Sequence, residues 1–229
     1  MKTKKFILVI IVFILLVNNT NAQTDPNFEF KNKVREEVGS VKKINKFENE
    51  DLKKTIHIRF LYEDYKQAYI SKSKEVYLLR YNIYTDEMEY VKNNSIYNLD
   101  KKENKIIDFF NIKTKYGVFN IKDKLNYFLI KNSGKNSVLI KQYVHFDEGK
   151  KAVSQYDIKV TPKFYRKKDK VFIAFNNIDV KSVPKKKKKF YLLFNNKATL
   201  IKTYMNKQKL SHKNLDDLVK IVSYYNSII

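Results

Sequence analysis

The sequence of 229 residues has no cysteine and no tryptophan, and it contains only four glycines and three prolines. Without cysteine, disulfides and thiol chemistry are excluded, and so is the lipid-modified cysteine of a bacterial lipoprotein. Glycine-rich phosphate loops and glycine-flanked serine nucleophiles are both missing from a chain so poor in glycine. The common routes to nucleotide binding and to serine or cysteine catalysis therefore have no support in the sequence.

Arginine is also scarce, because only four of the 47 basic residues are arginines. Lysine, asparagine, isoleucine and tyrosine are abundant, and this composition is typical of an AT-rich genome. Specific recognition of bases and phosphates relies on the planar fork of arginine. A non-specific nucleic-acid binder is therefore the weaker alternative for this basic chain.

Candidate metal-binding and acid–base residues are few and scattered. His57, His145 and His212 lack the short spacing of zinc ligands, so each is expected at an exposed strand position or helix end, and no metal or cofactor is expected. Three groups of neighbouring carboxylates could supply the pair that a glycosidase sets across a sugar: Glu36/Glu37, Asp86/Glu87/Glu89 and Asp216/Asp217. A solvated turn tip is the simpler expectation for Asp86 and Glu87, and a secreted enzyme acting on an acidic polymer is an alternative to a non-enzymatic protein.

The N-terminus has the pattern of an export signal. Three lysines within the first five residues precede an unbroken apolar run, Phe6–Val17, and a small residue, Ala22, ends the segment. The run is shorter than the roughly 20 residues that a membrane-spanning helix needs. The pattern predicts cleavage before Gln23 and a periplasmic or secreted protein.

Charge is distributed unevenly along the chain, whose formal net charge is +23. Residues 23–104 hold 16 basic and 15 acidic side chains, whereas residues 105–229 hold 28 basic and 9 acidic ones. This asymmetry predicts an electropositive face and an anionic partner.

The densest basic stretch lies between residues 163 and 189, where eleven basic residues stand against two acidic ones and aromatic residues alternate with them. A solvated loop after Pro184 is the simpler interpretation of its five consecutive lysines. The functional hypothesis is a surface that binds an anionic lipid, lipopolysaccharide, an acidic polysaccharide or an acidic protein. The candidate residues are Lys163, Arg166, Lys167, Lys168, Lys170, Lys181, Lys185, Lys186, Lys187, Lys188 and Lys189.

Alternation of apolar and polar residues with a period of two dominates the middle of the chain. It predicts an α+β fold, with an antiparallel β meander, sandwich or open barrel followed by a C-terminal helical segment. The expected organisation is a signal peptide (1–22), a polar N-terminal lead-in (23–54), an antiparallel β domain (55–183) and a helical segment packed on the sheet (184–229).

Individual strands and helices follow from the same pattern. Strands are expected at 55–61, 75–84, 88–91, 105–112, 116–121, 125–131, 137–146, 152–160, 163–166 and 171–175, with a turn over 167–170. Helices are expected at 190–194 and 199–205, and Ser211 is expected to cap a final amphipathic helix.

Two segments resemble a known group of sequences. Leu79–Glu89, which reads LRYNIYTDEME, is similar to a segment of small exported, β-rich proteins of flavobacteria-type Gram-negative bacteria. Asn214–Val219 and Ser223–Ser227 resemble the C-terminus of the same group. The resemblance implies an envelope location and a β-rich body with a helical end. It implies no reaction, ligand or site residue.

Overall fold

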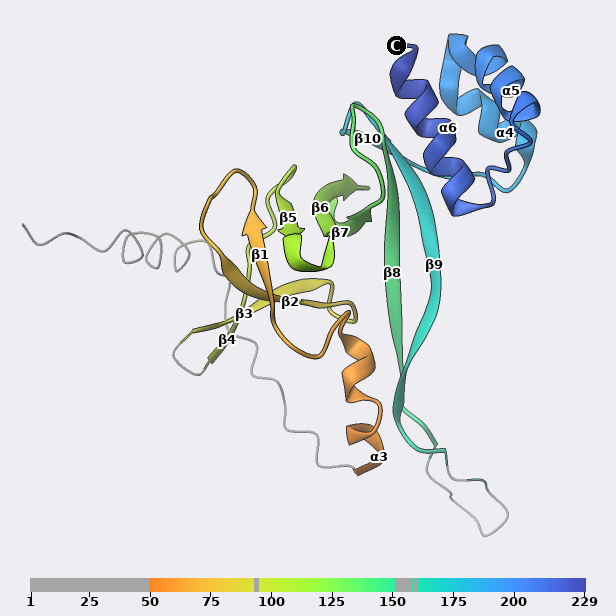
Figure 1. The fold of residues 1–229 in the computed structure, drawn as a ribbon. Coiled ribbons are helices and arrows are strands. Elements are labelled where there is room, and N and C mark those ends of the chain that lie inside the picture. Colours follow the sequence, from red (N-terminus) through yellow and green to blue (C-terminus); the bar gives the residue numbers. More distant parts are fainter. Residues whose placement is uncertain (1–49, 93–94, 151–157, 159) are drawn as a thin grey trace, which may run out of the picture. The chain divides into compact units, whose positions relative to one another are not determined.

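Ten strands followed by a group of short helices make up the described part of the protein (Figure 1). The computed structural model describes residues 50–92, 95–150, 158 and 160–229, all within one compact unit, Gly39–Ile229. The strands are β1 (Lys66–Ile70), β2 (Tyr77–Asn82), β3 (Glu87–Lys92), β4 (Ser95–Asn98), β5 (Ile106–Phe109), β6 (Thr114–Ile121), β7 (Lys124–Ile130), β8 (Ser137–Asp147), β9 (Lys163–Phe175) and β10 (Asp179–Ser182). The helices are α3 (Glu50–Lys53), α4 (Lys187–Tyr191), α5 (Ala198–Lys207) and α6 (Leu215–Ser227), with 3-10 helices η1 (Ile56–Arg59), η2 (Phe110–Ile112) and η3 (Leu192–Lys197).

All neighbouring strands pair antiparallel in one sheet of order β10-β9-β8-β7-β6-β5-β1-β2-β3-β4. Strands β5 to β10 follow each other as one meander, and β1 to β4 form a second. The two meanders join where β1 pairs with β5. The predicted α+β class, dominated by antiparallel strands, is confirmed.

The sheet is buried on both faces at β6 and β7. Tyr116 and Val118 face the main core, together with Tyr127 of β7. The alternate residue Phe119 packs on the other face in a smaller cluster with Phe128 and Leu139. Because strand side chains alternate between faces, one strand contributes to two cores.

The C-terminal helices cover the far end of β8 and β9 and form a further core. Val138 of β8 and Ile173 of β9 lie in it with the fully buried rings of Phe190 and Phe194. Neither α4 nor α5 is long enough to be stable alone in water, so this packing is what holds the helices in place.

The last helix begins three residues later than the predicted cap. Asn214 is the N-cap, and its side-chain oxygen accepts a hydrogen bond from Asp217 N at 3.0 Å. Asp217 Oδ2 in turn accepts from Ser211 N at 2.9 Å, so Ser211 is held by the first turn but does not cap it. The prediction of Ser211 as N-cap is wrong because asparagine at 214 is an equally good cap closer to the apolar stripe.

Two predicted strand boundaries are also wrong. Residues 56–59 form η1 and not a strand, because Arg59 is buried and its Nε donates to Ile56 O at 3.2 Å, which closes a tight turn. The turn predicted at Lys167–Lys170 does not exist, since β9 runs unbroken through it. Its partner β8 pairs with β9 from Lys163 to Ala174, with one irregularity between Lys141 and Tyr143.

Several short elements give no clear signal in the sequence. Strands β1, β4 and β10 have four or five residues each and were not predicted. Most of the strand predicted at 152–160 lies outside the described residues. Among the helices of the described part, none is long and apolar enough to cross a membrane.

Candidate functional site: a basic surface beside a buried charge network

The eleven basic candidate residues, which we call the lysine-rich surface, are all exposed. Five lie on β9, Lys181 lies on β10, and the other five lead into α4. Lys181 forms an ion pair with Asp179, with 2.7 Å between Nζ and Oδ2. The remaining ten form no ion pair with any residue of the described ranges, so their charge is available to a partner.

Five of the eleven residues of the lysine-rich surface lie on a two-stranded ribbon, defined here as residues 141–147 of β8 and 163–170 of β9 (Figure 1). On one side, β7 pairs with β8 only through Ile140 and Leu139. On the other side, β10 pairs with β9 only between Phe172 and Phe175. Within the described part of the chain, the ribbon strands therefore pair only with each other. The β9 edge is nevertheless covered at one point, where Phe164 N donates to Thr55 Oγ1 at 3.0 Å.

The pairing register assigns the ribbon residues to two faces. Lys170 pairs with Lys141, and Lys167 pairs with Tyr143. Directly paired residues point to the same side, and alternate residues of a strand share that side. Lys163, Lys167 and Lys170 therefore share one face with Tyr143. Lys141 lies at the inner end of this face, where it is buried against Asp86. The contact of Lys170 Nζ with the Tyr143 ring, 5.1 Å from its centroid, agrees with this assignment.

The opposite face of the ribbon packs against the body of the protein. Phe164 is buried there, with the Arg59 guanidinium 5.5 Å from its ring centroid and Tyr84 in edge contact at 5.1 Å. Arg166 lies on this face as well, since it pairs with Val144. Burial raises the pKa of the Tyr116 phenol, and the nearby Arg166 guanidinium opposes that shift. The basic residues of the ribbon are thus divided between its two faces.

The five consecutive lysines begin in extended backbone and end in the first turn of α4. Lys186 is the N-cap residue, and its side chain makes no capping hydrogen bond. Before it, Lys185 O lies 3.2 Å from His212 Nε2. His212 is only 5% exposed and stacks on Phe190 at 4.7 Å. The prediction of an exposed His212 is therefore wrong, because its ring belongs to the helical core and holds the start of the lysine run.

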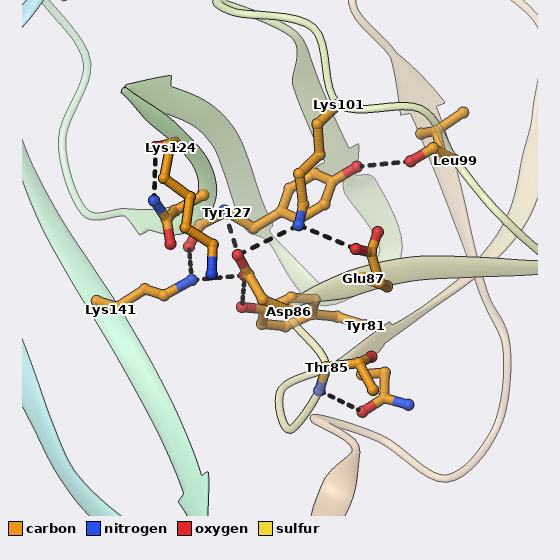
Figure 2. A network of polar contacts seen from close by, with 11 residues as sticks. Tyr81, Thr85, Asp86, Glu87, Leu99, Lys101, Lys124, Tyr127 and Lys141 are labelled. Atoms are coloured by element: carbon orange, nitrogen blue, oxygen red, sulfur yellow. Dashed lines mark hydrogen bonds and ion pairs between the residues drawn. The ribbon is translucent and has the colours of Figure 1, made fainter. Parts of the chain in front are cut away.

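A buried charge network lies at the turn between β2 and β3 (Figure 2). Asp86 Oδ1 accepts from Lys141 Nζ at 2.5 Å, from Tyr81 Oη at 2.7 Å and from Tyr127 N at 3.3 Å. Lys101 Nζ lies 3.4 Å from Asp86 Oδ2 and 3.1 Å from a Glu87 oxygen. The Asp86 carboxylate therefore ties the turn to β7 and β8.

Burial sets the electrostatics of this network. It lowers the pKa of the Lys141 ammonium, and the Asp86 carboxylate opposes that shift by its charge and its hydrogen bond. Burial also raises the pKa of the Tyr81 phenol well above its usual value, and the charge of Asp86 adds to that effect. The Asp86 carboxylate is bound best when the Tyr81 phenol is neutral and can donate a hydrogen bond, and when the Lys141 ammonium is charged.

The expectation of a solvated turn tip at Asp86 and Glu87 is wrong. Asp86 has a φ of 59°, a left-handed conformation that aspartate tolerates better than most residues. That conformation turns the carboxylate inward, where Lys141, 55 residues further on, meets it. No pattern local to the turn reveals this contact, since it depends on the pairing of distant strands.

Within the described ranges, no group of three or more histidine, aspartate or glutamate side chains could hold a metal ion. His57 and His145 are exposed, as predicted, and lie on different elements. Comparison with protein-family models, with curated proteins and with solved structures finds no match to this chain.

Proposed function

We propose that this is an exported, non-enzymatic protein that contacts an anionic component of the cell envelope through its lysine-rich surface. The proposed work is structural or adaptor-like, in the periplasm or outside the cell. The signal-like N-terminus and the resemblance to exported proteins support the location. The partner is a phosphorylated lipid, lipopolysaccharide, an acidic polysaccharide or an acidic protein.

One observation carries the proposal: ten exposed basic side chains of the lysine-rich surface form no ion pair with a residue of the described part of the chain. Two lysines of the interior differ from these exposed ones. Lys101 and Lys141 are bound to carboxylates in the network around Asp86. Because these two lysines are paired with carboxylates and ten basic residues of the lysine-rich surface are not, the surface carries a strong positive electrostatic potential.

A non-enzymatic role is also favoured by the state of the Asp86–Glu87 pair. Acid–base work on a sugar needs carboxyl groups that face the substrate and exchange protons with it. Here Asp86 is only 15% exposed in its side chain and is bound by Lys141, Lys101 and the Tyr81 hydroxyl. These contacts stabilise the protein, and they leave no free acid at this position.

The proposal is tested by replacing the five lysines 185–189 with glutamine. Because each lysine near an anionic surface contributes on the order of 1 kcal/mol at low salt, we expect binding to lipopolysaccharide to weaken at least about tenfold. Biosensor measurements at low and high salt give the affinities. The matched control replaces five exposed lysines elsewhere: Lys124, Lys131, Lys135, Lys202 and Lys207.

The control variant has the same net charge as the test variant and should bind nearly as well as the unmodified protein. Equal loss in both variants would show that net charge alone matters. Undiminished binding by the test variant would show that lysines 185–189 do not contribute to the binding site. Failure of the unmodified protein to bind lipopolysaccharide, anionic vesicles and polygalacturonate alike would refute the proposed function.

A further inference from the structure

We propose that one face of the β8–β9 ribbon binds a linear acidic polysaccharide. This ribbon face consists of Tyr143, His145 and Asp147 of β8 and of Lys163, Tyr165, Lys167 and Lys170 of β9. The inference rests on the proposed function and names the class of its partner. In the proposed complex, the lysines form ion pairs with carboxylates of successive sugars, while the tyrosine hydroxyls and the histidine form hydrogen bonds with sugar hydroxyl groups.

Cations and ring side chains alternate along the ribbon face. At the far end Lys163 pairs with Asp147. It is followed on this face by Tyr165, which pairs with His145, and then by Lys167, which pairs with Tyr143. Tyr165 is 37% exposed, and His145 is exposed as well. Each ring carries a hydrogen-bonding atom at its tip, so the steps from Tyr165 to Lys170 offer either a positive charge or a polar group. At the Lys163 step the face also carries the Asp147 carboxylate, which accepts a hydrogen bond from Gly149 N at 3.0 Å.

The geometry of the ribbon face suits a chain-like partner. Residues on one face of a strand repeat about every 6.6 Å, so Lys163 and Lys167 are about 13 Å apart along β9. The ammonium groups consequently form a row and not a plane. A linear polymer with a charge on each unit can follow such a row and contact several lysines together, which raises its affinity through multivalency.

A flat membrane fits the ribbon less well than a polymer does. Arg166 projects from the opposite face, so a planar surface that meets Lys163 and Lys167 cannot also meet Arg166. Tyr165 is the one large apolar side chain of the ribbon that is exposed among the described residues. The ribbon therefore lacks the exposed aliphatic groups that proteins bury in the headgroup region of a bilayer.

The rings are also poorly placed for stacking with nucleic-acid bases. Base stacking needs a free ring face. The Tyr143 ring is covered on one side by Lys170, and Tyr165 and His145 meet edge to face at 5.1 Å with an interplanar angle of 67°. No arginine lies on the ribbon face to form a bidentate contact with phosphate. Polar ring tips beside lysines match a polyhydroxylated, carboxylated chain better.

The test uses the purified full chain and polygalacturonate as the probe. Replacing Lys163, Lys167 and Lys170 together with glutamine should raise the dissociation constant at least about tenfold, because three of the cations that contact the polymer are removed. The variant Tyr165→Phe removes a single hydroxyl group and should raise it about two- to fivefold. Titration calorimetry at constant salt supplies both values.

The matched control replaces Lys131, Lys202 and Lys207 with glutamine, which removes the same charge from exposed positions outside the ribbon. It should change the dissociation constant less than about twofold. Circular dichroism shows whether each variant keeps the fold. For a triple variant that does not fold, the single change Lys167→Gln, expected to cost about threefold, replaces it in the comparison.

Two results would overturn the inference. The first is an unchanged affinity of the ribbon variant for polygalacturonate while lysines 185–189 still matter for lipopolysaccharide, which leaves the proposed function standing. The second is affinity for single-stranded oligothymidylate or for phosphatidylglycerol vesicles more than about tenfold above that for polygalacturonate, which assigns another partner class. Absence of binding to every anionic probe would overturn both proposals together.

Discussion

Replacing Asp86 by asparagine is expected to lower the free energy of unfolding by about 3–5 kcal/mol, because it leaves a buried ammonium group without its counter-charge. Lys141 is 8% exposed in its side chain, and Asp86 is its only ion-pair partner among the described residues. Asparagine keeps the shape of the side chain and tolerates the left-handed backbone at this position. The substitution therefore isolates the effect of the charge. Urea unfolding at neutral pH measures it.

Two further variants test whether the loss of stability in Asp86→Asn comes from the unpaired charge of Lys141. Asp64→Asn removes the partner of Lys66 in an ion pair where the aspartate is 84% exposed, and it should change the free energy of unfolding by less than about 1 kcal/mol. Adding Lys141→Met to Asp86→Asn removes the unpaired charge and should restore much of the lost stability. If the double variant is no more stable than Asp86→Asn alone, the buried charge is not the cause.

Replacing Phe194 by alanine should also cost about 3–5 kcal/mol, through the cavity left in the core between the helices and the sheet. The Phe194 ring is fully buried and contacts the rings of Phe190, Tyr225 and Phe175, with centroid distances of 5.1, 5.0 and 6.0 Å. Phe175 belongs to β9, so this core joins the C-terminal segment to the sheet. Calorimetry should show a single unfolding transition at a lower temperature than in the unmodified protein.

The control for Phe194→Ala lies two residues away. Leu192 is 72% exposed, and its replacement by alanine should leave the unfolding temperature almost unchanged. Two separate transitions, of which only one moves in Phe194→Ala, would contradict this account. They would mean that the helices unfold independently of β8 and β9.

Much of the fold could be predicted from local sequence patterns. Alternation placed β2, β3, β6, β7 and β8 within a few residues of their ends, because each has a buried and a less buried face or lies between clear turns. Apolar spacing likewise placed the last helix. The short strands β1 and β4 escaped prediction since four or five residues hold too few alternations to stand out.

The arrangement in space could not be predicted in the same way. The two meanders join through β1 and β5, whose pairing depends on contacts between residues far apart in the chain. Residues 167–170 predict a turn because all four are charged, yet they lie on a strand, β9, where their side chains are exposed. Exposure of the lysine-rich surface was expected, whereas its division between the two faces of the ribbon was not.

The central claim is that exposed, unpaired lysines bind an anionic partner, and the salt dependence of binding tests it most directly. The unmodified protein is titrated with lipopolysaccharide at increasing sodium chloride concentrations. Because salt screens charges on exposed side chains, the affinity should fall steeply and continuously as the ionic strength rises. Binding of equal strength at low and high salt would contradict the account, and so would absence of binding at low salt to lipopolysaccharide, anionic vesicles and polygalacturonate alike.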